Sequence, residues 1–170
     1  MNNVVDKYRE WELDLIREDL KKNSFPYAIL MEQWQGDFNI GQCIRNGNAF
    51  GAKEVFYIGK KRYDRRGAVG TYLYTTVKHL ENFDQLRQLK ATYVFVGVDN
   101  IEGAVPVESF QWPENPLMIF GEEGYGLTPD VVQLCDAVVA ITQYGSVRSL
   151  NAGTASGIIM FDFVNKLNGK

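Results

Sequence analysis

Residues 117–141 read LMIFGEEGYGLTPDVVQLCDAVVAI, and this stretch decides the expected fold. The apolar run Leu117–Phe120 predicts a buried strand, and a turn with three glycines follows it. Thr-Pro-Asp is typical of a helix start, so we expect a helix over Leu127–Cys135 and a second strand over Ala137–Ile141. A strand, a helix and a strand in succession indicate a parallel α/β sheet.

The same alternation continues on the N-terminal and C-terminal sides of this stretch. Apolar runs predict further strands at Tyr27–Met31, Lys53–Ile58 and Thr92–Val98, with strand or mixed structure at Tyr72–His79. Helical patterns cover Val5–Lys22, Asn39–Phe50, Asn82–Lys90 and Ser149–Leu167. We therefore expect a single domain over residues 1–170, with a mostly parallel sheet, helices on both of its faces and the first helix as an N-terminal extension.

Polar and small residues mark the ends of two of these helices. Asp37 or Asn39 is expected to cap the start of the second helix, and Gly51 to close it. Ser149 is expected to cap the last helix, with Asn151 in its first turn. The small residues that follow, over 152–157, would let another backbone or helix approach closely.

The composition is that of a folded globular protein, with 45% hydrophobic and 23% charged residues. Cys43 and Cys135 fall in predicted buried helices, and two cysteines cannot build a disulfide framework, which favours reduced thiols in a reducing compartment. The start of the chain lacks the pattern of a signal peptide, and the longest apolar run, near 157–161, is too short to span a bilayer. We expect a cytoplasmic protein that contacts no membrane.

Several familiar kinds of chemistry find no support in the residue pattern. No Gly-x-Gly-x-x-Gly follows a strand and no P-loop pattern occurs, which disfavours the alternative of a nucleotide-dependent oxidoreductase on a doubly wound sheet. His79 is the single histidine, and nothing near it suggests a catalytic triad, so a packing or surface role is expected. His, Cys and acidic residues show no ligand spacing, so no metal site is expected.

Three polar segments remain as candidates for chemistry, at residues 39–51, 120–127 and 141–157. Each lies next to predicted buried strands or helices, and parallel sheets bind ligands beyond the carboxyl ends of their strands. Taken singly, each has a plain structural explanation: a helix cap with a surface arginine, an exposed glycine-rich loop, and a capped helix. Occurring together in one α/β domain, they predict a functional site.

In this order, the three segments resemble the three motifs of the SpoU class of RNA methyltransferases, in the SPOUT superfamily. The first has the family's asparagine at Asn39, then a glycine, then Arg45 and a closing Phe-Gly. The second matches Gly-x-Glu-x-x-Gly-Leu and the third matches Ser-Leu-Asn, at Gly121, Glu123, Gly126, Leu127, Ser149, Leu150 and Asn151. The resemblance spans roughly residues 27–165. It departs at 142–143, where Thr-Gln replaces the common Pro-Met, and at 152–154, where Ala-Gly-Thr replaces Val-Ser-Val; these positions bear on cofactor affinity.

The resemblance implies an S-adenosylmethionine-dependent RNA (ribose-2′-O)-methyltransferase acting on tRNA or rRNA, with a deep trefoil knot in the C-terminal part of the fold. The implied cofactor-binding residues are Val98, Gly121, Ile141 and Leu150. The implied catalytic residues are Asn39, Arg45, Glu123, Ser149 and Asn151. Because arginine stays protonated in proteins, we expect Arg45 to orient the RNA phosphate and stabilise the developing alkoxide. The family also implies a homodimer with the pocket at its interface, and the small-residue face of the last helix suits such packing.

Contact with RNA is expected at a basic loop between the second strand and the next element. The net charge of −3 disfavours a generic nucleic-acid binder, but the charges are unevenly distributed, with an acidic stretch at 10–19. The loop supplies cations and one tyrosine for base stacking: Lys60, Lys61, Arg62, Tyr63, Arg65 and Arg66. The alternatives are a solvated turn for this loop and, for the whole chain, a non-catalytic RNA- or cofactor-binding paralogue.

Overall fold

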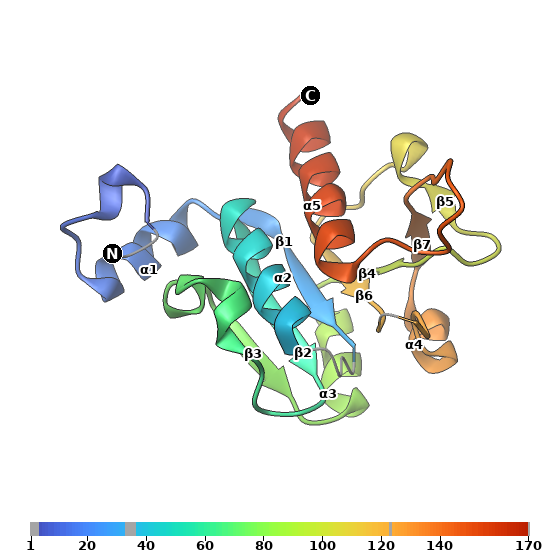
Figure 1. The fold of residues 1–170 in the computed structure, drawn as a ribbon, viewed down its shortest axis with the longest axis horizontal. Coiled ribbons are helices and arrows are strands. Elements are labelled where there is room, and N and C mark those ends of the chain that lie inside the picture. The colour runs from blue at the N-terminus through green and yellow to red at the C-terminus, as the bar shows by residue number, and fades with distance from the viewer. Residues whose placement is uncertain (1–3, 33–36, 123, 170) are drawn as a thin grey trace.

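The computed structural model describes residues 4–32, 37–122 and 124–169 (Figure 1). The strands are β1 (Phe25–Met31), β2 (Ala52–Ile58), β3 (Val77–Leu80), β4 (Val94–Val98), β5 (Val105–Pro106), β6 (Pro116–Phe120) and β7 (Ala137–Ala140). The helices are α1 (Leu13–Lys22), α2 (Asp37–Ala49), α3 (Phe83–Gln88), α4 (Pro129–Leu134) and α5 (Ala152–Asn168). Short 3-10 turns lie between several of these elements: Asp6–Tyr8, Arg65–Ala68, Thr71–Leu73, Leu89–Ala91 and Val107–Ser109.

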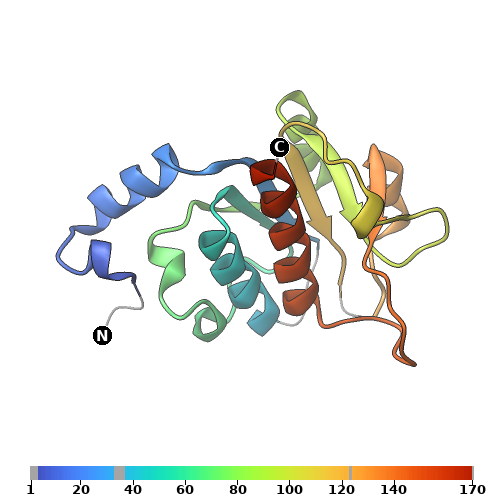
Figure 2. The same ribbon diagram turned by 90° about the horizontal axis from the view of Figure 1, so that it is seen from above.

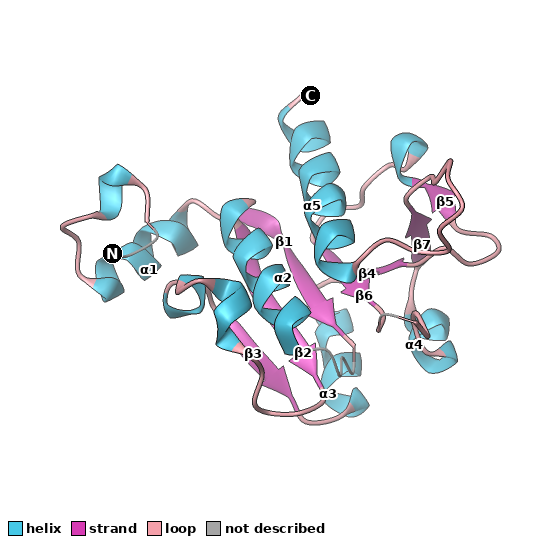
Figure 3. Cartoon of the chain, in the orientation of Figure 1, coloured by secondary structure: helices cyan, strands magenta, loops and turns pink. Residues whose placement is uncertain are grey.

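The strands of this described part form one parallel sheet in the order β3-β2-β1-β6-β4-β7-β5 (Figure 3). After each strand, a crossover connection carries the chain back to the edge of the sheet where strands begin. Neighbouring strands therefore run in the same direction. β6 lies between β1 and β4, so that Phe120 is paired with Met31 on one side and with Val98 on the other. The expected parallel α/β fold is confirmed, and segments distant in the chain meet at one sheet edge.

Helices cover both faces of the sheet, as expected (Figure 2). α2 and α5 lie side by side on one face, where Ile44 and Ile159 are fully buried. α3 and α4 lie on the other face, where Leu86 and Val131 are fully buried. Successive side chains of β1 join the two apolar layers in turn, because strand side chains alternate between faces.

The predicted N-terminal helix over 5–22 is wrong in its first half. The chain makes a 3-10 turn at Asp6–Tyr8, and α1 begins only at Leu13. The Tyr8 hydroxyl donates a hydrogen bond to Asp19 Oδ2 at 2.6 Å, and Lys7 Nζ lies 2.5 Å from the same oxygen. In one continuous helix, residues 8 and 19 would be about 16 Å apart along the axis. The turn therefore folds back onto α1.

Other helix ends differ from the prediction in detail. Ser149 does not cap the last helix; the side chain of Asn151 accepts a hydrogen bond from the Thr154 N–H at 3.1 Å and caps α5. Asn39 lies within the first turn of α2 and does not precede it as a cap, while Gly51, at φ +66°, follows the end of α2 as expected. The region 72–79 holds a 3-10 turn and β3, and the loop before β6 contains the two-residue β5, which was not predicted.

The two cysteines and the histidine serve packing. Cys43 is buried in α2, with Sγ 3.1 Å from Ser156 Oγ, whereas Cys135 follows the last residue of α4 and is half-buried. The ring of His79 lies 4.9 Å from that of Tyr57, and its Nε2 is 2.9 Å from the Gly59 carbonyl oxygen. The expected packing role of His79 is confirmed.

α5 is held on two sides. α2 lies along one side, and the connection between β4 and β6 contacts the other. Trp112 Nε1 donates to Asp162 Oδ2 at 2.8 Å, and Lys166 Nζ donates to the Val107 and Phe110 carbonyls at 2.5 and 3.2 Å. The last helix is thus enclosed by earlier parts of the chain. No helix within the described ranges is both long and apolar enough to cross a membrane.

Candidate functional site

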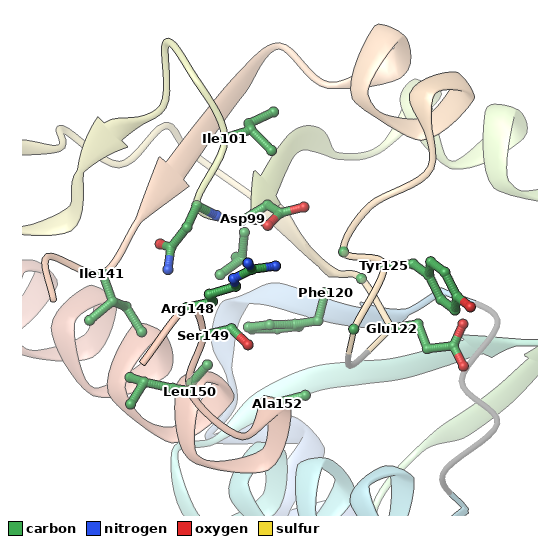
Figure 4. Close-up of a pocket in the computed structure, with 16 residues that line it drawn as sticks. Asp99, Ile101, Phe120, Glu122, Tyr125, Ile141, Arg148, Ser149, Leu150 and Ala152 are labelled. Atoms are coloured by element: carbon green, nitrogen blue, oxygen red, sulfur yellow. Dashed lines mark hydrogen bonds between the residues drawn. The ribbon is translucent and has the colours of Figure 1, made fainter. Parts of the chain in front are cut away.

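A pocket of about 260 Å³ lies at the carboxyl edge of the sheet, where β4, β6 and β7 end (Figure 4). This volume is close to the roughly 300 Å³ at which small-molecule sites begin. Its apolar lining comes from Val98, Ile101, Phe120, Ile141, Leu150, Ala152 and Ala155. Its polar lining includes Asp99, Asn100, Glu122, Arg148 and Ser149.

All four residues predicted to bind a cofactor line this pocket. Val98 ends β4, Gly121 follows β6, Ile141 follows β7, and Leu150 precedes α5. Figure 4 shows Ile141 and Leu150 on one side of Phe120 and Tyr125 on the other. Residues spread over some fifty positions of the chain meet here because parallel strands end at a common edge.

In the glycine-rich loop after β6, two backbone segments lie close together beside the pocket. Glu122 and Gly126 form a two-residue bridge, with N···O distances of 3.1 and 2.9 Å. A Cβ on Gly121 would lie 2.1 Å from the carbonyl carbon of Gly126 and 2.2 Å from the nitrogen of Leu127. The close approach of two backbone segments requires glycine at 121.

Asp99 holds this loop against the end of β4. Its Oδ2 accepts a hydrogen bond from the Leu127 N–H at 2.8 Å, and its Oδ1 accepts one from the Asn100 N–H at 2.7 Å. A Cβ on Gly126 would lie 2.3 Å from Asp99 Oδ2, and Gly126 has φ +71°. Sequence reasoning missed Asp99, although its place directly after a buried strand was a usable signal.

Glu32, also missed, ties the end of β1 to the start of α4. The residue is only 1% exposed. Its carboxylate accepts hydrogen bonds from the Thr128 hydroxyl and from the Thr128 N–H, the latter at 3.1 Å, and its own N–H donates to the Phe120 carbonyl at 2.9 Å. Burial raises the pKa of Glu32, and the hydrogen bonds from Thr128 oppose that rise.

Replacing Glu32 with glutamine should alter how stability depends on pH. Because the folded-state pKa of Glu32 is raised above its ordinary 4.5, its contribution to stability is complete below that pH and is lost as pH rises through the folded-state pKa. We expect the free energy of unfolding of the wild type to fall relative to Glu32→Gln as the pH rises above 4.5, by at most about 1.4 kcal/mol per pH unit. Urea titrations at several pH values measure this, with the exposed Glu18→Gln as control. Parallel curves for Glu32→Gln and the wild type would contradict it.

The predicted residues Asn39 and Asn151 are in direct contact. Asn151 Nδ2 donates to Asn39 Oδ1 at 3.1 Å, which joins the first turn of α2 to the cap of α5. Ser149 lines the pocket two residues earlier. Glu123, another of the predicted catalytic residues, lies outside the described residues.

Arg45 lies away from this group on the outer face of α2. It is exposed and is absent from the residues that line the pocket. Phe38, seven residues earlier and therefore on the same helix face, is 54% exposed. Asn46, the neighbour of Arg45, points instead to α5 and donates to the Gly153 carbonyl at 2.8 Å. One chain therefore brings together Asn39, Asn151 and the pocket, but not Arg45.

The small-residue face of α5 is occupied by α2 of the same chain. Asn46 Nδ2 lies 2.9 Å from Ser156 Oγ, and a Cβ on Gly153 would meet Gln42 Oε1 at 2.3 Å. The suggestion that this face packs in a dimer is corrected accordingly: the small residues allow two helices of one chain to touch.

In the basic loop after β2, some cations are exposed to solvent and others contact neighbouring side chains. Lys60, Lys61 and Arg62 are exposed. Arg66 is paired with Asp64, with Nη2–Oδ2 and Nε–Oδ2 distances of 2.5 and 2.9 Å, and the Arg65 guanidinium lies 4.9 Å from the centre of the Tyr72 ring. Tyr63 is half-buried, with its ring centre 5.4 Å from that of Tyr57. The ring of Tyr63 thus serves packing against β2.

No group of three or more His, Cys, Asp or Glu side chains within the described ranges could hold a metal ion. The pocket has both apolar and polar lining and lies at the carboxyl edge of a parallel α/β sheet, where such sheets bind small organic ligands.

The chain belongs to the SpoU rRNA methylase family, whose model matches residues 26–161. It is 23% identical to the tRNA (guanosine(18)-2′-O)-methyltransferase of Aquifex aeolicus over 90% of this chain and 75% of that protein. It is 28% identical to the 23S rRNA (guanosine-2′-O-)-methyltransferase RlmB of Ralstonia nicotianae over 83% of this chain and 59% of that protein. The crystal structure of the SpoU methyltransferase AviRb from Streptomyces viridochromogenes with the cofactor AdoMet matches with a TM-score of 0.76 and 26% identity, over 83% of this chain and 57% of that one. The matched region thus covers between 57% and 75% of the length of these relatives.

Proposed function

We propose that this protein transfers a methyl group from S-adenosylmethionine to the 2′-hydroxyl of a ribose in tRNA or rRNA, as a cytoplasmic enzyme. One observation carries the proposal: the segments matching the three family motifs line or border a single pocket at the carboxyl edge of the sheet. The names of the tRNA and rRNA 2′-O-methyltransferase relatives support the reaction class, and the AdoMet complex of AviRb supports the cofactor.

The pocket fits the cofactor in its chemistry. Gly121 lines the pocket at a point where a Cβ would collide with the backbone of Gly126 and Leu127, and apolar side chains make up much of the remaining lining. We assign cofactor binding to Val98, Gly121, Ile141 and Leu150, with Asp99 and Glu32 holding the loop that carries Gly121. Bound S-adenosylmethionine supplies a methyl group already activated by a sulfonium, so the protein has mainly to position the acceptor hydroxyl in line.

The residues proposed for positioning and charge stabilisation are Asn39, Arg45, Glu123, Ser149 and Asn151. The pair formed by Asn39 and Asn151 fixes α2 relative to the start of α5, which sets the orientation of the whole of α2. An arginine such as Arg45 can donate two parallel hydrogen bonds to a phosphate, or donate to an alkoxide, and it stays positively charged while it does so. Exposed Lys60, Lys61 and Arg62 would attract the RNA backbone.

A homodimer would bring Arg45 to a pocket. Phe38, on the face of α2 that also carries Arg45, is 54% exposed, and Phe161 on α5 is 58% exposed. The ring of Phe161 lies 6.3 Å from that of Phe50, which directly follows α2, and we propose that the exposed faces of α2 and α5 form one apolar surface. We propose that two copies pair through this surface, each supplying Arg45 to the pocket of the other. A C-terminal trefoil knot, which the family resemblance implies, is also proposed for this part of the fold.

Methyl transfer is tested with purified protein, radiolabelled S-adenosylmethionine and bulk RNA from cells lacking the gene. We expect label in alkali-resistant dinucleotides, because a 2′-O-methyl group blocks hydrolysis of the adjacent phosphodiester. Binding of S-adenosylhomocysteine without any transfer to this RNA would favour the non-catalytic paralogue. Binding of NAD with no binding of S-adenosylhomocysteine in calorimetry would favour the oxidoreductase.

A further inference from the structure

Two tyrosines on the loops around the pocket are almost completely exposed. Tyr125, on the glycine-rich loop, is 90% exposed, and Tyr144, on the loop between β7 and α5, is 93% exposed. Both loops line the pocket, and Tyr125 itself is part of that lining. Figure 4 shows the ring of Tyr125 directed outward from the glycine-rich loop, away from Ile141 and Leu150.

The folded chain makes little use of either ring. Among the described residues, no aromatic ring packs against Tyr125 or Tyr144, and no hydrogen bond involves either hydroxyl. Glycines flank both: Gly124 and Gly126, at φ +104° and +71°, surround Tyr125, and Gly145 follows Tyr144. A Cβ at Gly124 or Gly145 would meet nothing within 4 Å, so both rings stand on narrow, open turns. Their flat faces are available to a partner.

We infer that Tyr125 and Tyr144 stack on unpaired RNA bases beside the nucleotide that enters the pocket. A tyrosine ring offers a flat apolar face of the kind on which single-stranded bases stack, with little dependence on base identity. Bases inside an A-form helix are already stacked on one another and are not presented in this way. The substrate class that fits is therefore RNA whose target nucleotide lies in a loop or another unpaired segment. This inference rests on the proposed function and specifies its substrate.

Cations are available to an RNA strand near the two rings, alongside the carboxylates of Asp99 and Glu122 that also line the pocket. Arg148 is the one lysine or arginine among the described residues lining the pocket, and its exposed side chain lies between the two loops (Figure 4). The exposed cations Lys60, Lys61 and Arg62 follow β2 at the same edge of the sheet. β2 is two strands away from β6, which corresponds to roughly 10 Å. An RNA strand whose base stacks on Tyr125 can therefore reach these cations.

The test compares alanine and phenylalanine variants at both tyrosines. Binding of a short single-stranded RNA carrying 2-aminopurine is followed by fluorescence anisotropy and quenching, with S-adenosylhomocysteine present. We expect Tyr125→Ala and Tyr144→Ala each to raise the Kd for RNA about tenfold and to reduce the quenching. Tyr125→Phe and Tyr144→Phe should bind like the wild type, because stacking needs the ring and not the hydroxyl. The affinity for S-adenosylhomocysteine should stay unchanged in all four variants.

The controls separate stacking from other roles. Leu15→Ala removes an exposed apolar side chain on α1, far along the chain from the pocket loops, and should leave RNA binding unchanged. The same RNA annealed to its complement should bind wild type and alanine variants equally. A Kd for single-stranded RNA within twofold of wild type in the double alanine variant overturns the inference. So does a shift to monomer in light scattering with RNA affinity retained, because the rings would then contact a second copy. If the wild type neither binds S-adenosylhomocysteine nor transfers methyl groups, the proposed function fails instead.

Discussion

A Gly121→Ala protein should fold but lose its cofactor. The added Cβ would lie 2.1–2.4 Å from three backbone atoms of Gly126 and Leu127, and backbone cannot swing aside as the end of a flexible side chain can. The loop must therefore open by about an ångström or more, which breaks its bridge and displaces the main chain that lines the pocket. We expect the Kd for S-adenosylhomocysteine to rise more than about a hundredfold, with methyl transfer lost in parallel. Isothermal calorimetry and the transfer assay measure the two effects.

Gly145→Ala is the matched control, because it changes the other pocket loop in the same way. A Cβ there meets no atom within 4 Å, and Gly145 is not among the glycines with positive φ. Its affinity for S-adenosylhomocysteine should stay within twofold of wild type. Circular dichroism and a urea titration of Gly121→Ala show whether the loss of binding reflects a folded protein. A folded Gly121→Ala protein with unchanged cofactor affinity would remove Gly121 from the site.

Replacing Arg45 should impair methyl transfer without weakening cofactor binding. Because Arg45 does not line the pocket of its own chain, Arg45→Ala should leave the Kd for S-adenosylhomocysteine unchanged. Methyl transfer should fall by about 10²–10³, the usual effect of removing one group that stabilises charge in a transition state. Arg45→Lys keeps the charge but not the planar fork, so we expect only partial recovery. Full transfer by Arg45→Ala would exclude Arg45 from the chemistry.

Mixed dimers decide which chain supplies Arg45. Arg45→Ala and Gly121→Ala chains, co-expressed with different tags, each lack activity as homodimers. If Arg45 acts on the partner's pocket, every heterodimer contains one complete site, and a random mixture should recover about a quarter of wild-type activity. If Arg45 acts within its own chain, the heterodimer contains no complete site and stays inactive. Purification through both tags isolates the heterodimer for this measurement.

Much of the fold follows from local pattern. Short apolar runs bounded by turn residues, such as Leu117–Phe120, predict buried strands, and their alternation with helices predicts parallel pairing. The order of the strands is a long-range property that periodicity does not contain. The insertion of β6 between β1 and β4 depends on how whole faces pack, and the two residues of β5 are too few to show a period.

The residues of the candidate site, too, could be predicted from the sequence only in part. Glycine-rich and polar loops after strands are visible locally, which is why Val98, Gly121, Ile141 and Leu150 could be named and are found around one pocket. Contacts such as the one between Glu32 and Thr128 join residues 96 positions apart, and nothing near Glu32 announces it. The fold-back of Tyr8 onto Asp19 is hidden for the same reason, since a helical pattern does not reveal where the chain reverses.

The position of α5 has a consequence for biosynthesis. Leu150, Ala152 and Ala155 form part of the pocket wall, and they follow all seven described strands in chain order. When the ribosome has synthesised all seven described strands, the nascent chain still lacks this part of the pocket wall and the helix cap at Asn151. Ligand capture must therefore wait until α5 has left the exit tunnel and settled beside α2, after every described strand has been synthesised.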